Sequence, residues 1–355
     1  MIVKGIDTVE FGLEVSGYFE NFKEFWEVLS SMKNEAQDTG REREININNV
    51  NLKVHRKGIP FYEYQLSCDD FLIYFMDQPV LNTPPIKVRF LSSYLWSFGF
   101  QGAVERFYKW FECFKGEINC TKVSRIDICV DTDEIEFLEE DIGQIITRAK
   151  GKTKHFVNDE YYNGRNFSGF TIGRGQPLLG RIYNKTLEIK TSQKTWFHQV
   201  WKEKSWNEEK DVWRVEFQIR RKGLKEFGVN SLEEFINEED GIWMYLTTKW
   251  LTLKIPTEDA NQTRWEVSQK WLVIQKAYIN QDTSSAVRER VKIGNTAQLL
   301  DQVTGLFITI GALNNHVDIE STMEMAKQWL EDKLQKNDTT FIEQKEIRRR
   351  KFLDA

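Results

Sequence analysis

The chain has 355 residues, of which 49 are lysine or arginine and 54 are acidic; 40% of all residues are hydrophobic and 13% are aromatic. This composition is typical of a globular protein large enough for more than one core, and it excludes disorder of the whole chain. Only 6 prolines and 21 glycines are present, without a fixed repeat, which excludes collagen-like and solenoid architectures.

The longest apolar stretch covers residues 303–313 and is interrupted by threonine and glycine. A bilayer requires roughly 20 apolar residues, so we expect no membrane partner. Asp7 and Glu10 stand where a secretory signal would be apolar, which predicts a cytoplasmic location.

The net charge of −5 conceals one basic segment, residues 148–225, with 18 lysines and arginines against 8 acidic residues. A local patch matters more than the total for binding a polyanion. This segment predicts either a phosphate-binding face or an ordinary solvated surface.

Hydrophobic periodicity in the first third of the chain predicts an α+β lobe. Strands are expected at residues 3–15, 45–54, 62–66, 71–75 and 86–90, and helices at 22–32 and 92–114. A second α+β lobe follows, with strands at 124–131, 168–173, 180–185 and 212–220 and helices at 138–149, 196–206 and 232–251.

After Pro256 the sequence has helical periodicity and no further proline. We therefore expect an α+β fold in which two βα lobes form a largely antiparallel sheet platform, followed by a helical C-terminal domain. The expected domains are residues 1–117, 118–255 and 262–355, the last for DNA recognition or oligomerisation.

Three of the expected strands have one apolar and one reactive face, because alternate residues of a strand share a face. The reactive faces combine carboxylates, a tyrosine and cations: Arg125, Asp127, Cys129 and Asp131; Arg181, Tyr183 and Lys185; Arg214, Glu216, Gln218 and Arg220. This inventory suits phosphodiester cleavage, in which a metal ion polarises the phosphate and the tyrosine attacks it. Flanking Arg181 and Lys185 would favour the phenolate. The alternative is a half-solvated sheet with cross-strand ion pairs.

The segments SRIDICVDTDE, SGFTIGRG, LLGRIYNKTLEI and WRVEFQIRRKGLKEFG, preceded by IKVRFLSSYLWSFG, occur in this order. Together they resemble the rolling-circle replication initiation factor family, also called Rep_trans, over roughly residues 85–255. Its members include plasmid initiators, filamentous-phage replication proteins and relaxases of conjugative elements.

The resemblance implies a sequence-specific, metal-dependent DNA nickase and ligase that uses Mg²⁺ or Mn²⁺. It places the catalytic tyrosine at Tyr183, beside Arg181 and Lys185, and the metal ligands at Asp127 and Glu216, with Asp131 as a further candidate. We expect the bound DNA to contact Arg174, Arg214, Arg220, Arg221 and Lys222.

The expected partners are origin DNA, single-stranded or in a hairpin at the nick site, and a second copy of the chain. The sequence contains no GxxxxGK[ST] motif, so a host or element-encoded helicase would have to unwind the duplex. No HxH pair is present, so carboxylates would hold the metal.

Two alternatives stay open. Tyr161 and Tyr162, in the segment NDEYYNGR, are the other tyrosines of the basic segment, although a stacking or structural role fits their loop context better. The chain as a whole is alternatively a non-catalytic DNA-binding regulator of replication on the same fold, in which Tyr183 only stacks or hydrogen-bonds.

Overall fold

The computed structural model describes residues 1–18, 22–78, 80, 82–114, 116–158, 165–278 and 296–346, without the side chains of 296–299, 301 and 302. The chain divides into two compact units, Met1–Glu289 and Arg290–Ala355.

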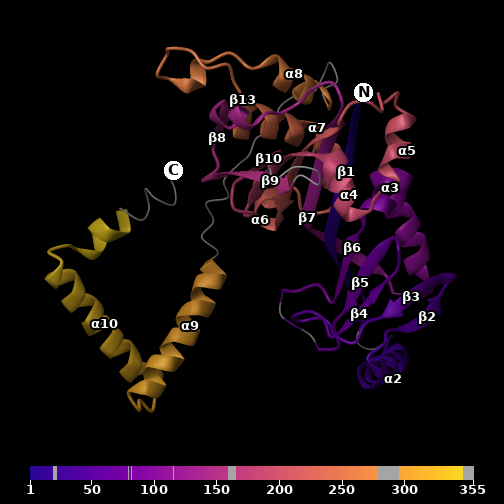
Figure 1. The fold of residues 1–355 in the computed structure, drawn as a ribbon. Coiled ribbons are helices and arrows are strands. Elements are labelled where there is room, and N and C mark those ends of the chain that lie inside the picture. Colours follow the sequence, from indigo (N-terminus) through magenta and orange to yellow (C-terminus); the bar gives the residue numbers. More distant parts are fainter. Residues whose placement is uncertain are drawn as a thin grey trace. The chain divides into compact units, whose positions relative to one another are not determined.

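Within the described part of the first unit, one sheet of 11 strands has the order β2-β3-β4-β5-β6-β1-β7-β12-β11-β10-β9 (Figure 1). Every neighbouring pair is antiparallel. The strands are β1 (Ile2–Val15), β2 (Arg43–Ile47), β3 (Val50–Val54), β4 (Tyr64–Ser67), β5 (Phe71–Phe75), β6 (Ile86–Phe90), β7 (Ile118–Thr132), β9 (Lys152–Asn158), β10 (Arg165–Ile172), β11 (Leu178–Asn184) and β12 (Trp213–Arg220).

Two short strands, β8 (Ile145–Thr147) and β13 (Leu251–Leu253), pair with each other in a separate sheet. The helices are α2 (Lys23–Thr39), α3 (Ser92–Phe111), α4 (Lys185–Ser192), α5 (Phe197–Lys202), α6 (Arg221–Glu226), α7 (Leu232–Tyr245), α8 (Gln269–Lys276), α9 (Thr296–Leu313) and α10 (Ile319–Lys336).

The apolar face of the large sheet forms the main core, and α3, α7 and α8 contribute to it. The rings of Phe107 in α3 and Phe11 in β1 are 5.9 Å apart, and those of Trp243 in α7 and Phe217 in β12 are 5.3 Å apart. Burial of each such side chain contributes about 1.5–3 kcal/mol. The opposite face of the sheet is therefore the one available for polar chemistry.

Helices α4 and α5 cover one end of the polar face. Ile189 of α4 and Phe197 and Trp201 of α5 form a small buried cluster with Val3 and Val212. This cover takes the polar side chains beneath it out of water.

The N-terminal half of β1 has a strand on one side only, because β6 pairs only with residues 9–13. Helix α3 begins beside this free edge, where Ser92 Oγ donates to Asp7 Oδ1 over 2.9 Å. The ring of Trp96 lies against Gly5, and a Cβ at position 5 would come within 2.4 Å of that ring. Glycine is thus required for this close approach.

The α+β class and the largely antiparallel platform are confirmed, but the two expected lobes share one continuous sheet. The helix expected over 138–149 is wrong: a 3₁₀ turn at Glu139–Gly143 leads into β8. Three successive β-branched residues, Ile145, Ile146 and Thr147, favour a strand, and β8 has β13 as its partner.

Helix α8 belongs to the first unit, although a helical domain was expected from residue 262. Trp271 and Ile274 are fully buried, and Trp243 Nε1 donates to the carbonyl oxygen of Ile274 over 3.0 Å. The packing of α8 therefore places the start of the separate helical unit later in the chain, at Arg290.

The second unit contains α9 and α10. Its apolar side chains are largely exposed; Leu306, Ile308 and Leu313 of α9 expose 62%, 69% and 78%, and Trp329 of α10 exposes 63%. Within the described residues, no helix has both the length and the apolar character that a membrane span requires.

Candidate active site

The polar faces of β7, β12 and β11 form one surface because these strands are direct neighbours. In one row across the sheet, Tyr183 lies opposite Arg214, and Arg214 lies opposite Asp131. In the next row Arg181 lies opposite Glu216.

Asp127 lies opposite Gln218, which stands two residues after Glu216 on β12. Since alternate residues share a face, Asp127 and Glu216 lie on the same face as diagonal neighbours. The alternation in the sequence predicts this arrangement.

The hydroxyl of Tyr183 donates a hydrogen bond to Glu216 Oε2 over 3.0 Å. The other oxygen of this carboxylate accepts a hydrogen bond from Arg181 Nη1 over 2.6 Å. Gly169 pairs with Tyr183 across β10 and β11 and has a φ of +150°, and a Cβ there would lie 2.2 Å from the carbonyl oxygen of Ile182. Glycine therefore lets β10 approach the strand of Tyr183.

Burial raises the pKa of Tyr183 well above its usual value, and the charge of Glu216 raises it further, while Arg214 opposes the shift. The phenol is thus protonated at neutral pH in this structure. Both cations that were expected to favour the phenolate already have carboxylate partners: Arg181 is bound to Glu216 and Lys185 forms an ion pair with Glu188. Glu216 is in place to accept the phenolic proton.

Asp127 is almost completely buried and is paired with Arg125, which donates to Oδ1 over 2.8 Å and also to Oδ2. Burial raises the pKa of Asp127 to about 7; the charge of Glu216 acts in the same direction and the hydrogen bond from Arg125 opposes it. The two carboxylates therefore repel each other across the face.

A pair of carboxylates with water fits the usual coordination of Mg²⁺, and a divalent cation would offset the repulsion between Asp127 and Glu216. Among the described residues no group of three or more histidine, cysteine or acidic side chains is arranged to hold a metal ion. Metal binding by Asp127 and Glu216 would require Arg125 to release Asp127, because Arg125 donates to both oxygens of that carboxylate.

Asp131 and Arg214 form a fully buried ion pair beneath α5. Arg214 Nε donates to Asp131 Oδ1 over 2.6 Å and Nη2 donates to Oδ2 over 2.8 Å; Trp201 Nε1 also donates to Oδ2, over 2.9 Å. Arg214 Nη1 reaches Asp7 Oδ1 over 2.6 Å. Burial alone would raise the pKa of Asp7, but the charge of Arg214 holds it below its usual value.

This network contradicts two expectations. Arg214 has no exposed surface and is saturated by two carboxylates, so it cannot contact a DNA phosphate. Asp131 is equally buried and both of its oxygens accept hydrogen bonds, so it does not fit the role of a metal ligand. Both residues instead form the buried ion pair that lies next to Tyr183 in the same row across the sheet.

Lys185 begins α4 and exposes only 2% of its side chain. Burial lowers its pKa and the charge of Arg214 lowers it further. Its amino group lies 5.7 Å from the centre of the Tyr183 ring. Lys185 thus borders the tyrosine from the covered side, where it has no open path to a bound phosphate.

The remaining cations expected to bind DNA differ in accessibility. Arg174 and Lys222 are exposed and Arg220 is half-buried. Arg221 is committed to the fold, because its Nη1 donates to the carbonyl oxygen of Val123 over 3.1 Å and its Nη2 to Asn230 Oδ1 over 3.1 Å. A phosphate contact by Arg221 would require these bonds to break.

The two central strands β1 and β6 also contribute charged side chains to the polar face, which the sequence motifs did not predict. Glu10 of β1 lies opposite Arg125, and Lys87 and Arg89 of β6 lie beside it. The signal was present as charged residues within the apolar strand sequences IDTVEF and IKVRF. Tyr161 and Tyr162 lie outside the described residues.

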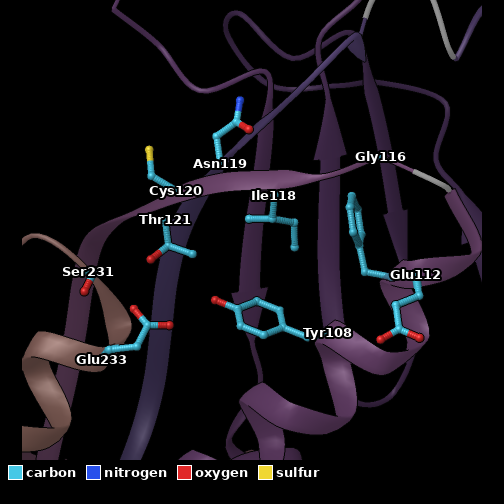
Figure 2. A pocket seen from close by; sticks show the side chains of 10 residues that line it. Tyr108, Glu112, Gly116, Ile118, Asn119, Cys120, Thr121, Ser231 and Glu233 are labelled. Carbon is cyan, nitrogen blue, oxygen red and sulfur yellow. The ribbon is translucent and has the colours of Figure 1, made fainter.

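A separate hollow of about 540 Å³ lies between the end of α3, the start of β7 and the start of α7 (Figure 2). Figure 2 shows the hydroxyl of Tyr108 pointing toward Thr121 and Glu233. Burial and the charge of Glu233 raise the pKa of Tyr108. Its lining includes Glu112 and Glu233 but no lysine or arginine, which makes it unsuited to a phosphate.

No family model matches the chain, and no curated protein matches it. Among solved structures, it is similar to a rolling circle replication initiator protein from Geobacillus stearothermophilus, with 14% identity and a TM-score of 0.47. The match covers 81% of this chain and 100% of that protein.

Proposed function

We propose that the chain nicks and rejoins DNA at a replication or transfer origin of the rolling-circle type, with Tyr183 as the nucleophile. The observation that carries this proposal is the hydrogen bond from Tyr183 to Glu216, on a sheet face that also holds Arg181 and Asp127. The ordered sequence motifs that resemble the Rep_trans family support it independently.

In the cleavage step, the Tyr183 oxygen forms a bond to phosphorus as the bond from phosphorus to the leaving sugar oxygen breaks. The phenolic proton passes to Glu216, and the leaving oxygen takes a proton from water. Attack by the freed hydroxyl on the phosphotyrosine reverses these events and rejoins the strand. The nucleophile remains neutral until it reacts because burial and Glu216 raise its pKa.

Arg181 exposes 36% of its side chain and holds Glu216 in place. Its Nη2 also donates to Gln218 Oε1 over 3.3 Å, and the N–H groups outside these two bonds would face a phosphate oxygen, where they stabilise the charge that develops during attack. Asp127 and Glu216 are the residues that would hold Mg²⁺ or Mn²⁺, which when bound supplies positive charge at a non-bridging phosphate oxygen.

The direct test is covalent capture. The full chain is mixed with a random-sequence single-stranded DNA library and Mg²⁺ or Mn²⁺, and the DNA that stays bound after denaturation is sequenced. We expect an adduct with one preferred cleavage site. Tyr183→Phe should abolish it, whereas Tyr74→Phe, a matched change on the distant strand β5, should not.

Two outcomes would redirect the proposal. An adduct that survives Tyr183→Phe would move the nucleophile to Tyr161 or Tyr162, which the corresponding phenylalanine variants would test. DNA binding without any adduct, across both metals, would support the non-catalytic regulator.

A further inference from the structure

A row of three arginines crosses four neighbouring strands of the polar face. Arg89 of β6 lies opposite Glu10 of β1, Glu10 lies opposite Arg125 of β7, and Arg125 lies opposite Arg220 of β12. We call Arg89, Arg125 and Arg220 the arginine row.

The arginine row has more positive charge than its acidic neighbours balance. Glu10 is shared by three cations, at 3.0 Å from Lys87, 3.4 Å from Arg125 and 4.0 Å from Arg89. Asp127 is the second carboxylate, paired with Arg125. In the part of the chain that the structure describes, the three arginines of the row and Lys87 therefore have only two carboxylates, Glu10 and Asp127, to balance their charge.

The guanidinium groups of Arg89 and Arg220 have N–H donors that are not used in the ion pairs described above. Arg89 Nε is buried and, among the described residues, has no hydrogen-bond partner. Arg220 forms no ion pair within the described part of the chain, although it lies directly opposite another arginine. Like charges directly opposite each other in a sheet are destabilising, and a bound anion would offset the repulsion between Arg125 and Arg220.

We infer that the arginine row binds a backbone phosphate of the single-stranded DNA whose scissile phosphate reacts at Tyr183. The inference rests on the proposed function and adds to it a second phosphate site, distinct from the reacting one. Guanidinium groups suit this role because their fixed N–H pairs match phosphate oxygens.

The spacing of the strands sets how far this site lies from the nucleophile. Tyr183 is level with Arg214, and Arg220 stands six positions after Arg214 on β12, which is about 20 Å at the rise of a strand. A stacked single strand advances about 3.4 Å per nucleotide, so the second phosphate lies about six nucleotides from the cleavage point, and fewer if the strand is extended.

The first experiment measures binding alone, in full-length protein carrying Tyr183→Phe so that no adduct forms. Affinity for oligothymidylates of increasing length is measured by fluorescence anisotropy at several salt concentrations. We expect the Arg89→Gln, Arg220→Gln double variant to reduce the salt slope by about 0.7, the value for one phosphate contact of a single strand, and each single variant to reduce it by less. Arg41→Gln, which removes the same charge from an exposed loop, should leave the slope unchanged.

The affinity of the parent protein should also rise in a step once the oligonucleotide is long enough to span both sites. This step should be absent in the Arg89→Gln, Arg220→Gln double variant. The inference would be overturned if the folded double variant had the same salt slope and the same dependence of affinity on oligonucleotide length as the parent protein.

The second experiment locates the phosphate. In the cleaved sequence, single phosphates are replaced by neutral methylphosphonates at successive distances from the nick. We expect one position within about six nucleotides to weaken binding by the parent protein but not by the double variant. Cleavage without such a position would refute phosphate binding by the arginine row and would leave the role of Tyr183 as nucleophile unaffected. If the double variant loses salt slope but the parent protein cleaves no DNA, the arginine row is supported and the proposed nicking activity is refuted.

Discussion

Tyr183 donates a hydrogen bond to the same carboxylate, Glu216, that Arg181 binds over 2.6 Å. One acidic side chain thus connects the proposed nucleophile to Arg181. A change at Glu216 therefore alters both the protonation of the phenol and the position of the guanidinium.

The first prediction concerns Glu216→Gln. The amide keeps the shape of the side chain but accepts no proton, so single-turnover cleavage should fall by about 10²- to 10⁴-fold. The pKa of Tyr183 should decrease, because the charge of Glu216 contributes to its elevation, yet remain high through burial. Glu35→Gln, at an exposed ion pair on α2, is the matched control and should cleave normally. Unchanged cleavage by Glu216→Gln would remove Glu216 from the proton transfer.

The second prediction concerns the pH dependence of stability at Asp127. Its pKa is about 7 in the folded protein, against an ordinary value of 3.8, so the folded state binds this proton more tightly than the unfolded state. The contribution of Asp127 to the free energy of unfolding should therefore decrease as pH rises from about 4 to about 7, by at most about 1.4 kcal/mol per pH unit.

Asp127→Asn should remove this decrease, as measured by urea denaturation across the pH range. The control Asp240→Asn removes a half-exposed carboxylate that pairs with Lys4, and it should leave the decrease in place. If the unfolding free energy of Asp127→Asn falls with pH as steeply as that of the unchanged protein, Asp127 does not have the raised pKa.

The third prediction concerns Arg214→Met. This change leaves Asp131 and Asp7 beneath α5 without their cation, which should destabilise the fold by about 3–5 kcal/mol. Adding Asp131→Asn should recover part of the loss, since one of the unpaired charges is then absent. DNA affinity at low temperature, where the variant is folded, should match that of the unchanged protein; a reduced salt slope would restore Arg214 as a phosphate contact.

The strands of the site were predictable because the alternation of side chains is fixed by the backbone itself. Asp127 and Glu216 occupy alternate positions in strands with the same pattern, and they share a face. The hydrogen-bond and ion-pair partners of each side chain were harder to predict, because they depend on the strand order and on the loops. The sequence does not indicate that α5 brings Trp201 onto Asp131, and this cover turns Arg214 from a surface cation into a buried one.

The helix expected at residues 138–149 illustrates the same limit. Its acidic residues suggest a helix start, but Asp141 instead accepts a hydrogen bond from the backbone of Leu138 over 2.8 Å and closes a single turn. The β-branched residues that follow find β13, which lies about a hundred residues away in the sequence. Local propensity was overridden by a distant pairing partner.

The last prediction concerns the second unit, Arg290–Ala355. Helix α9 contains no lysine or arginine and exposes large apolar side chains, so it lacks the cations that a DNA-recognition helix uses. Exposed apolar surface of this kind is typical of protein association. Oligomerisation is therefore the role that α9 favours, whereas α10 contains the three lysines Lys327, Lys333 and Lys336.

A truncation after Glu289 should keep α8 and the core around Trp271, and with them adduct formation on single-stranded DNA. Its mass by light scattering should be that of a monomer, while the full chain forms a larger species. Truncation at Pro256 is the contrasting variant: it removes Trp271 and should destabilise the fold by at least about 3–5 kcal/mol. The opposite outcome is that the variant truncated after Glu289 keeps the oligomeric mass of the full chain but no longer prefers duplex origin over scrambled duplex at fixed salt. In that case the C-terminal helices serve DNA recognition instead.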